Sequence, residues 1–137
     1  MSTVIRPELS NKNKYWISRH RYYELKHYCL QYSEWEEEYL RLGDYILQSH
    51  NICPSDDPFS DPTAKIAVRR TELLDKMNML KKLAKEADEA LWPYIFQGVT
   101  QGVSFVYLRY TMEMPAEKSM YYDRYRRFFW LLSKSHR

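Results

Sequence analysis

Hydrophobic residues recur along most of this chain at the three- and four-residue spacing of amphipathic helices. The spacing predicts a helix from about Tyr15 to Tyr32 and a long one over Pro62–Ala87, which holds no glycine and no further proline. Shorter helices are expected over residues 34–43, 89–101, 104–112 and 116–133. Tight turns are rare, with 3 Gly and 6 Pro among 137 residues. The predicted fold class is therefore all-α, a helical bundle with one long central helix.

Polar residues and prolines mark where these helices begin. Asp61 precedes Pro62, which suits a capping carboxylate followed by a proline at the first helical position. Ser33 and Glu36 have the spacing of a capping box, which predicts a fresh helix start at residue 34. Further caps are expected at Asp88 and Ser104, and helix ends near Gly43 and at Gly102.

The length favours a single domain, within which three regions differ in character. Residues 1–13 are polar and aperiodic, and we expect a flexible tail. Residues 14–101 are predicted to form the helical bundle and self-association region, interrupted by a Pro- and Asp-rich loop over 44–60. Residues 102–137 are predicted to form a helix–turn–helix, with its turn at Met114-Pro115.

The long helix over 62–87 carries a heptad-like seam. Its apolar positions follow one another at intervals of 7, 4, 3, 4 and 3, with Arg70 in one slot: Ile66, Leu73, Met77, Leu80, Ala84 and Ala87. Leu74, Leu83 and Val68 broaden this stripe. Two interpretations stay open, a core helix packed within one chain or a surface that joins two copies into a homodimer.

The last predicted helix mixes cations with aromatic residues. At about 100° per residue, Tyr121, Tyr125, Phe128 and Leu132 share one face, which is expected to dock on the preceding helices. A helix–turn–helix with a basic second helix commonly places side chains in the major groove of double-stranded DNA. The candidate DNA contacts are Lys118, Ser119, Tyr122, Arg124, Arg126 and Arg127. The alternative is an amphipathic terminal helix with solvated arginines.

Charge is polarised along the chain although its formal net value is only +3. Residues 104–137 hold seven Lys or Arg against three acids, whereas residues 33–44 hold five acids against Arg41. The acidic stretch is interpreted as a solvated helix face or as an acidic docking surface. Four cations lie near the N-terminus: Lys12, Lys14, Arg19 and Arg21. They are interpreted either as a second phosphate contact or as a solvated helix start.

The sequence offers no catalytic constellation, and we expect neither enzyme activity nor a cofactor. His27 and Cys29, two positions apart on a helix, would diverge by roughly 200°, so a zinc site shared with His50 and Cys53 is disfavoured and no metal is expected. Two cysteines in unlike contexts favour free thiols in a reducing compartment. No apolar run reaches the length of a membrane span, so we expect a cytoplasmic protein.

Several motifs together resemble the RinA/ArpU-like regulators of phages of Gram-positive bacteria. They are Gly102-Val-Ser104, Tyr107-Leu108, Met114-Pro115 and above all Tyr122-Asp-Arg-Tyr-Arg-Arg-Phe-Phe-Trp-Leu-Leu132. The resemblance implies a helical protein related in outline to sigma-factor region four, acting as a sequence-specific regulator of late phage genes in the bacterial host cell. It implies DNA contacts at Lys118, Tyr122, Arg124, Arg126 and Arg127. Met120 and Asp123 depart from the pattern, and Asp123 is unfavourable beside phosphate.

A second hypothesis is a phage-encoded, protein-binding inhibitor of a host nucleic-acid enzyme or a defence nuclease, comparable to an anti-CRISPR protein. The acidic stretch over 34–44 would occupy a basic groove, and the surplus tyrosines and tryptophans would anchor the interface. Host RNA polymerase or another host protein is accordingly a second partner candidate beside DNA.

Overall fold

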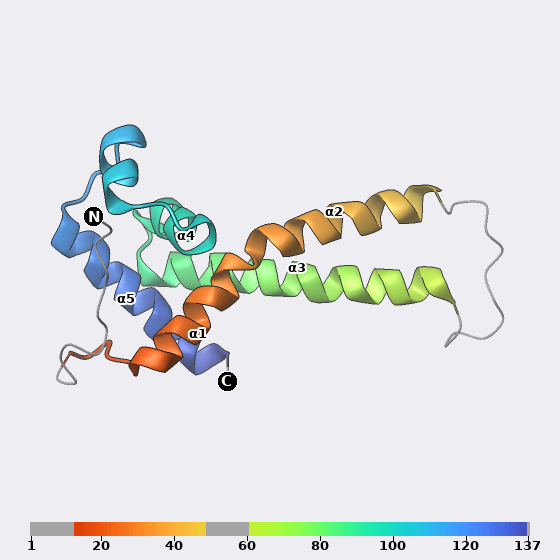
Figure 1. The fold of residues 1–137 in the computed structure, drawn as a ribbon, viewed down its shortest axis with the longest axis horizontal. Coiled ribbons are helices and arrows are strands. Elements are labelled where there is room, and N and C mark those ends of the chain that lie inside the picture. The colour runs from red at the N-terminus through yellow and green to blue at the C-terminus, as the bar shows by residue number, and fades with distance from the viewer. Residues whose placement is uncertain (1–12, 49–60, 137) are drawn as a thin grey trace. The chain divides into compact units, whose positions relative to one another are not determined.

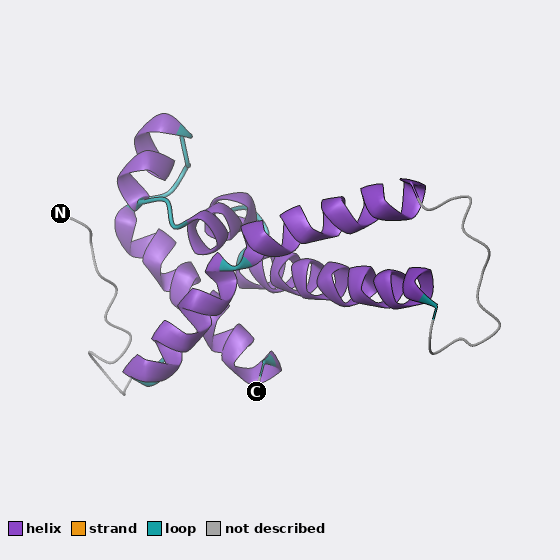
Figure 2. Cartoon of the chain, turned by 45° about the vertical axis from the view of Figure 1, so that its right-hand side comes forward, coloured by secondary structure: helices purple, strands orange, loops and turns teal. Residues whose placement is uncertain are grey.

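The structure is a computed structural model that describes residues 13–48 and 61–136. Within these ranges the chain is helical and holds no strand (Figures 1 and 2), which confirms the all-α prediction. The elements are α1 (Arg19–Leu30), α2 (Tyr32–Gln48), α3 (Pro62–Ala87), α4 (Trp92–Gln101), the π-helical turn η2 (Tyr107–Thr111) and α5 (Lys118–Ser135).

The chain divides into two compact units, Met1–Tyr32 with Leu80–Arg137, and Ser33–Met79. In the first unit α1, α4 and α5 pack on one another in every pairwise combination. Their fully buried side chains include Leu25, Cys29, Ile95, Val99, Tyr121, Phe128, Phe129 and Leu132. This three-helix core fixes α5, which carries the candidate DNA contacts.

Aromatic rings form the part of this core between α1 and α5. The hydroxyls of Tyr22 and Tyr125 lie 3.1 Å apart at hydrogen-bond distance. Phe129 contacts both rings, with its centroid 5.1 Å from that of Tyr22 and 4.9 Å from that of Tyr125. Burial raises the pKa of Tyr22, Tyr121 and Tyr125 above the usual value near 10. The folded core therefore requires neutral phenols.

We expect stability to fall as pH rises above about 10. The unfolded chain ionises its tyrosines near that pH, whereas folding raises the pKa of Tyr22, Tyr121 and Tyr125. The folded state thus holds more protons, so its stability is complete below the unfolded pKa and is lost as pH approaches the folded pKa. Urea unfolding between about pH 8 and pH 11, read with tyrosinate absorbance, checks this expectation. A midpoint that does not move above pH 10 would contradict it. Tyr110→Phe, at a 76% exposed position, should leave the dependence unchanged.

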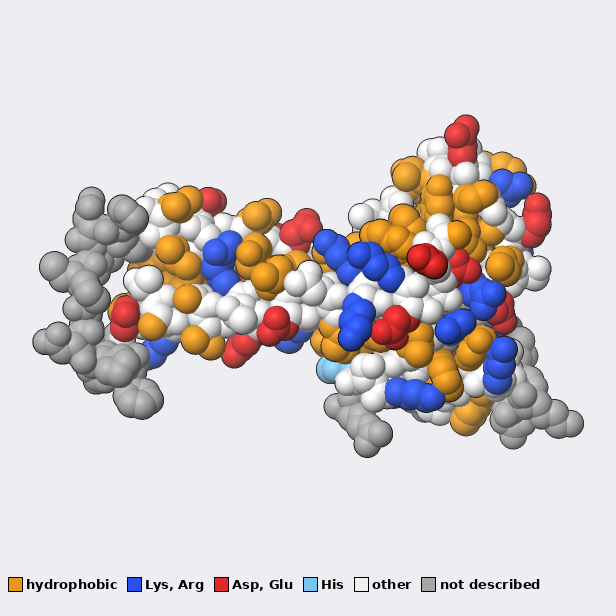
Figure 3. Space-filling model, turned by 180° about the vertical axis from the view of Figure 1, so that it is seen from behind, with side chains coloured by type: hydrophobic (Ala, Val, Ile, Leu, Met, Phe, Trp, Pro, Cys, Tyr) orange, Lys and Arg blue, Asp and Glu red, His pale blue; other side chains and the backbone are white. Residues whose placement is uncertain are grey.

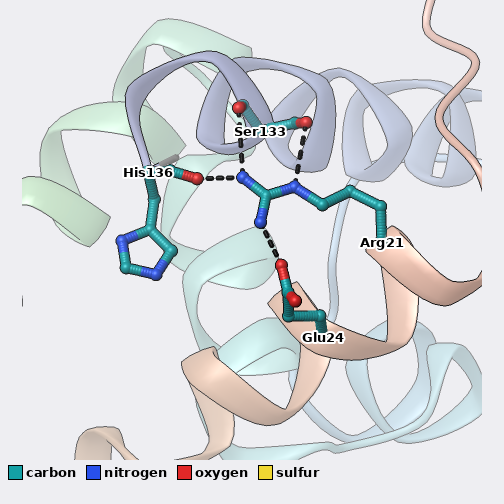
Figure 4. Close-up of polar contacts among 4 residues, drawn as sticks. All are labelled: Arg21, Glu24, Ser133 and His136. Carbon is teal, nitrogen blue, oxygen red and sulfur yellow. Dashed lines mark hydrogen bonds and ion pairs between the residues drawn. The ribbon is translucent and has the colours of Figure 1, made fainter.

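Arg21 of α1 anchors the carboxyl end of α5 (Figure 4). Its Nε donates to the Ser133 hydroxyl at 3.3 Å, and its Nη2 donates to the carbonyls of Ser133, at 3.2 Å, and His136. Glu24 pairs with the same guanidinium, and the His136 ring stacks on Tyr28 at 4.0 Å. A cation at these free carbonyls satisfies them and complements the helix dipole. Arg21 is thus committed to capping α5, a role that the sequence did not suggest.

In the second unit α2 and α3 lie side by side, and two arginines of α3 join them (Figure 1). Arg69 makes two hydrogen bonds to the carboxylate of Glu38, at 2.9 and 3.1 Å, which lowers the pKa of that carboxyl. Arg70 donates to the Tyr39 carbonyl at 3.1 Å and lies 4.0 Å from the centroid of the Tyr39 ring. Its guanidinium also passes Gly43, where a Cβ would come within 2.8 Å of Nη2. Arg70 therefore interrupts the apolar seam because it clamps α2.

The start of α2 differs from the prediction. The helix begins at Tyr32, and only Gln31 separates it from α1. Ser33 lies inside the first turn of α2 rather than before it, so the predicted capping box with Glu36 is wrong. The edge of the Tyr32 ring packs against Phe96 at a centroid distance of 5.0 Å. The contact between Tyr32 and Phe96 therefore lies in the first turn of α2, where the Ser33–Glu36 capping box was expected to begin the helix.

The end of α2 also differs, because the helix passes Gly43 and continues to Gln48. Gly43 is therefore a site of close approach by Arg70 and not a helix end. The first five residues of the loop predicted over 44–60 are helical, and the others lie outside the described residues. At the other end of the chain, α1 begins at Arg19 rather than near residue 15, after a turn in which Asn13 accepts the amide of Tyr15 at 2.8 Å.

The predicted start of α3 and the predicted end of α4 agree with the structure. Asp61 accepts the amide of Thr63 at 3.0 Å, and α3 spans the predicted residues from Pro62 to Ala87. Asp88 caps a turn rather than the helix itself, accepting two amides before α4 begins at Trp92. Gly102 ends α4 in the left-handed conformation at φ 69°, as predicted.

The seam of α3 is buried within the chain from its middle onward. Leu73, Met77, Leu80, Ala84 and Ala87 are each at most 5% exposed. Val68 and Leu74, which were expected to broaden the stripe, are exposed instead. This burial supports the interpretation as a core helix. A homodimer stays a prediction and would need a surface other than these buried positions.

Candidate nucleic-acid interface

The segment that leads into α5 is held in place by Arg109. Its guanidinium donates to the Met114 carbonyl at 3.0 Å and pairs with Glu117 at 3.4 Å. Met114 is fully buried, and its amide donates to the Leu108 carbonyl at 2.9 Å. A buried side chain and two backbone bonds thus fix where the chain turns before α5 begins at Lys118. The turn expected at Met114-Pro115 is confirmed.

The first helix predicted for the helix–turn–helix, over 104–112, takes an unusual form. Ser104 caps it, accepting the amide of Tyr107 at 3.1 Å. Only Phe105 and Val106 are α-helical, and the segment then continues as the π-helical turn η2, Tyr107–Thr111. Short π-helical turns occur often at functional sites. The helix–turn–helix itself stays a prediction.

The buried face of α5 agrees with the sequence and is wider than expected. Tyr121, Tyr125, Phe128 and Leu132 are buried as predicted, and Phe129 joins them at 1% exposure. On a helix of 100° per residue the opposite side carries residues spaced three or four apart. We call this side the outward face of α5, and it comprises Ser119, Asp123, Arg126, Arg127, Trp130 and Lys134.

Three of the six candidate contacts lie on the outward face of α5: Ser119, Arg126 and Arg127. Ser119 is exposed, and both arginines are partly exposed. Among the described residues, none makes an ion pair or hydrogen bond with the guanidinium of Arg126 or Arg127. These two adjacent cations are therefore available to an external anion.

Arg124 has a structural partner instead. Its Nε lies 3.2 Å from a carboxylate oxygen of Asp88, but the N–H is not aligned for a hydrogen bond, so the contact is an ion pair. Its Nη1 lies 3.6 Å from Asp123 on the same helix. Asp123 thus orients an arginine of its own helix. The side chain of Arg124 is only 27% exposed, and it ties α5 to the turn before α4.

Tyr122 and Lys118 lie on the flank of α5 opposite Arg124. The ring of Tyr122 contacts those of Phe105 and Tyr121, at centroid distances of 6.1 and 5.2 Å, and it is half-buried. Lys118 is the exposed first residue of the helix. The six candidates therefore point in three directions, because a spacing of one or two residues cannot keep side chains on one face.

The sequence analysis missed an aromatic and cationic ladder at the end of the outward face of α5. The ammonium of Lys134 lies 3.3 Å from the centroid of Trp130, and the Tyr15 ring packs against the same indole at 5.5 Å. Lys14 lies over Tyr15 at 4.9 Å. The spacing of four between Trp130 and Lys134 was a visible signal. Cation–π contacts of this kind hold Lys134 over the indole of Trp130 and Lys14 over the ring of Tyr15.

Charge on the wider surface is mixed. On the side drawn in Figure 3, Lys and Arg side chains lie among acidic and hydrophobic ones rather than in one basic field. The formal net charge of +3 is likewise too small to indicate a broad electrostatic footprint. Contact with a polyanion would have to be local, at a few adjacent cations.

The described residues form neither a metal site nor a membrane-spanning helix. No three His, Cys, Asp or Glu among them are grouped so that they could hold a metal ion. Cys29 is fully buried, burial raises the pKa of its thiol, and His50 and Cys53 lie outside the described residues. None of the described helices is both long and apolar enough to cross a bilayer.

Comparison with protein-family models, with curated proteins and with solved structures gives no match to this chain. The resemblance to phage regulators therefore stays a prediction, and the functional argument depends on the geometry of α5.

Proposed function

We propose that this chain is a DNA-binding regulator of late phage genes that contacts double-stranded DNA through the outward face of α5. The observation that carries the proposal is the pair Arg126 and Arg127, which lie side by side on a helix and lack an ion pair with any described residue. The opposite face of the same helix is buried in the three-helix core. A rigid helix with one buried face and one cationic face is the form in which DNA-binding proteins present a recognition helix.

Each residue of this face has a role that follows from its chemistry. Arginine contacts phosphates and can bind both acceptors of guanine, and a serine hydroxyl can bind phosphate. Arg126 and Arg127 are proposed to make the main contacts, and Ser119 a further contact about two turns nearer the start of α5. Arg124 is left out because it is paired with Asp88. Tyr122 is left out because its ring packs against Phe105 and Tyr121.

Replacing both arginines by alanine should weaken DNA binding by roughly 100-fold, because each contact contributes about 1–3 kcal/mol. Affinity would be measured by fluorescence anisotropy with a duplex selected from a random pool. The dependence on salt should also become shallower by about two counterions. The matched control replaces Lys65 and Lys82, two exposed cations of α3 for which the structure describes no partner. Equal affinity of the Arg126→Ala, Arg127→Ala variant and the control would overturn the assignment.

A second candidate is a protein-binding inhibitor of a host nucleic-acid enzyme or defence nuclease. One observation favours it: Glu36, Glu37 and Asp44 are exposed on α2 and make no ion pair with a described residue. Co-purification of a host enzyme that persists after nuclease treatment, from a chain without affinity for DNA, would support this candidate over the first.

A further inference from the structure

The outward side of α2 combines two exposed leucines with three exposed acids. Leu40 and Leu47 are 60% and 73% exposed, and their spacing of seven places them on one line along the helix. Glu36, Glu37 and Asp44 lie within about 60° of that line on either side and are exposed. We call these five residues the outward face of α2. The exposed Arg41 lies at the edge of this face, about 100° from Leu40 and one turn from both Glu37 and Asp44.

The contacts that hold α2 against α3 are made by other residues, on the inner side of α2. Trp35 is buried, Glu38 is bound by Arg69, and the Tyr39 carbonyl and ring are bound by Arg70. The helix is thus fixed from one side, while its outward face leaves two large apolar side chains in water. Exposed apolar area of this kind is unfavourable. A partner that covers the leucines would remove this area from water, and cations on the partner would pair with the three acids.

We propose that the outward face of α2 binds an amphipathic basic helix of a partner protein. Leucines seven apart offer an apolar seam to a second helix, and acids beside a seam select a partner with cations there. The same charges disfavour a second copy of this chain, because self-pairing in either direction brings acidic borders together. The inference does not depend on DNA binding by α5, and it supplies a contact surface for the second candidate function.

Synthetic helices of about 20 residues provide the probe. One has leucines at heptad positions flanked by lysines, a second has glutamates in place of the lysines, and a third has serines in place of the leucines. The full chain should bind the first at least about tenfold more tightly than either other peptide, measured by titration calorimetry. Amide shifts in NMR spectra should map to α2. Equal binding of the serine peptide, or shifts confined to other helices, would overturn the proposal.

Variants of the chain test the same surface from the other side. Leu40→Ser with Leu47→Ser, and separately Glu36→Gln with Glu37→Gln, should each reduce affinity for the leucine–lysine helix by about tenfold or more. Val68→Ser is the matched control, because this residue of α3 is as exposed as Leu40. A wild-type dimer in light scattering that dissociates on Leu40→Ser would show that a second copy covers the face, against the proposal. The same α2 variants are also titrated with DNA, and their DNA affinity should equal that of the wild type. The peptide titrations therefore test the α2 proposal, whereas the DNA titrations test the α5 assignment independently.

Discussion

Gly98→Ala is expected to lower the free energy of unfolding by roughly 3 kcal/mol, near the upper end of what overpacking costs. Gly98 lies inside α4, where alanine by propensity alone would stabilise the helix by about 1 kcal/mol. A Cβ at this position would lie 2.2 Å from the Tyr121 hydroxyl oxygen. Tyr121 is 2% exposed, so its ring has little room to retreat. Propensity and packing thus predict opposite signs, and urea unfolding decides between them.

The second-site variant Tyr121→Phe makes the test specific. Without the hydroxyl, the nearest atoms to the new Cβ are the Tyr121 Cζ position at 3.6 Å and Leu108 Cδ1 at 3.7 Å, which are ordinary contacts. Gly98→Ala should therefore cost little, or stabilise, in the Tyr121→Phe background, with a coupling of about 2 kcal/mol or more between the two sites. The same loss in both backgrounds would show that the hydroxyl is not the obstacle.

What the sequence predicted well depends on neighbours along the chain. The start of α3 follows from Asp61 and Pro62, and the end of α4 follows from Gly102, because both signals act within one helical turn. The inner face of α5 follows from the spacing of four apolar positions. These local rules were sufficient for the fold class and for most helices.

What it missed depends on contacts between distant residues. Gly43 has the local appearance of a helix end, yet it serves the passage of Arg70, 27 positions later. Ser33 lies inside α2 rather than before it, because the helix begins at Tyr32, whose ring packs against Phe96, 64 positions later. Nothing in a single sequence distinguishes a glycine that ends a helix from one that admits a side chain.

The candidate site shows the same division. Arg126 and Arg127 have the outward position that spacing alone predicts. Arg124 was counted with them because it lies on the same basic helix, but its partner Asp88 lies 36 positions earlier. The same holds for Arg21, whose capping role depends on carbonyls more than 100 residues away. Charged residues on a predicted helix can therefore be assigned to solvent or to a ligand only once the opposing helices are placed.

Phe129→Ala should cost about 4 kcal/mol, because it empties a fully buried ring site. The ring packs edge-on against Tyr22 and Phe128, at centroid distances of 5.1 Å each, and against Tyr125 at 4.9 Å. The loss would be measured by urea unfolding with unchanged slope, to confirm two-state behaviour.

The adjacent residue provides the control. Trp130 is partly exposed on the outward face of α5, so Trp130→Ala should lose less than about half as much, despite the larger side chain. Arg126→Ala with Arg127→Ala should stay within about 0.5 kcal/mol of the wild type. Equal losses at 129 and 130 would mean that α5 is rotated from the position described here. In that case the arginines would no longer be outward, and a DNA-binding defect in their variant would have to be attributed to lost folding. If Phe129→Ala costs clearly more stability than Trp130→Ala, a DNA-binding defect of the Arg126→Ala, Arg127→Ala variant is attributed to the lost arginine contacts on the outward face of α5.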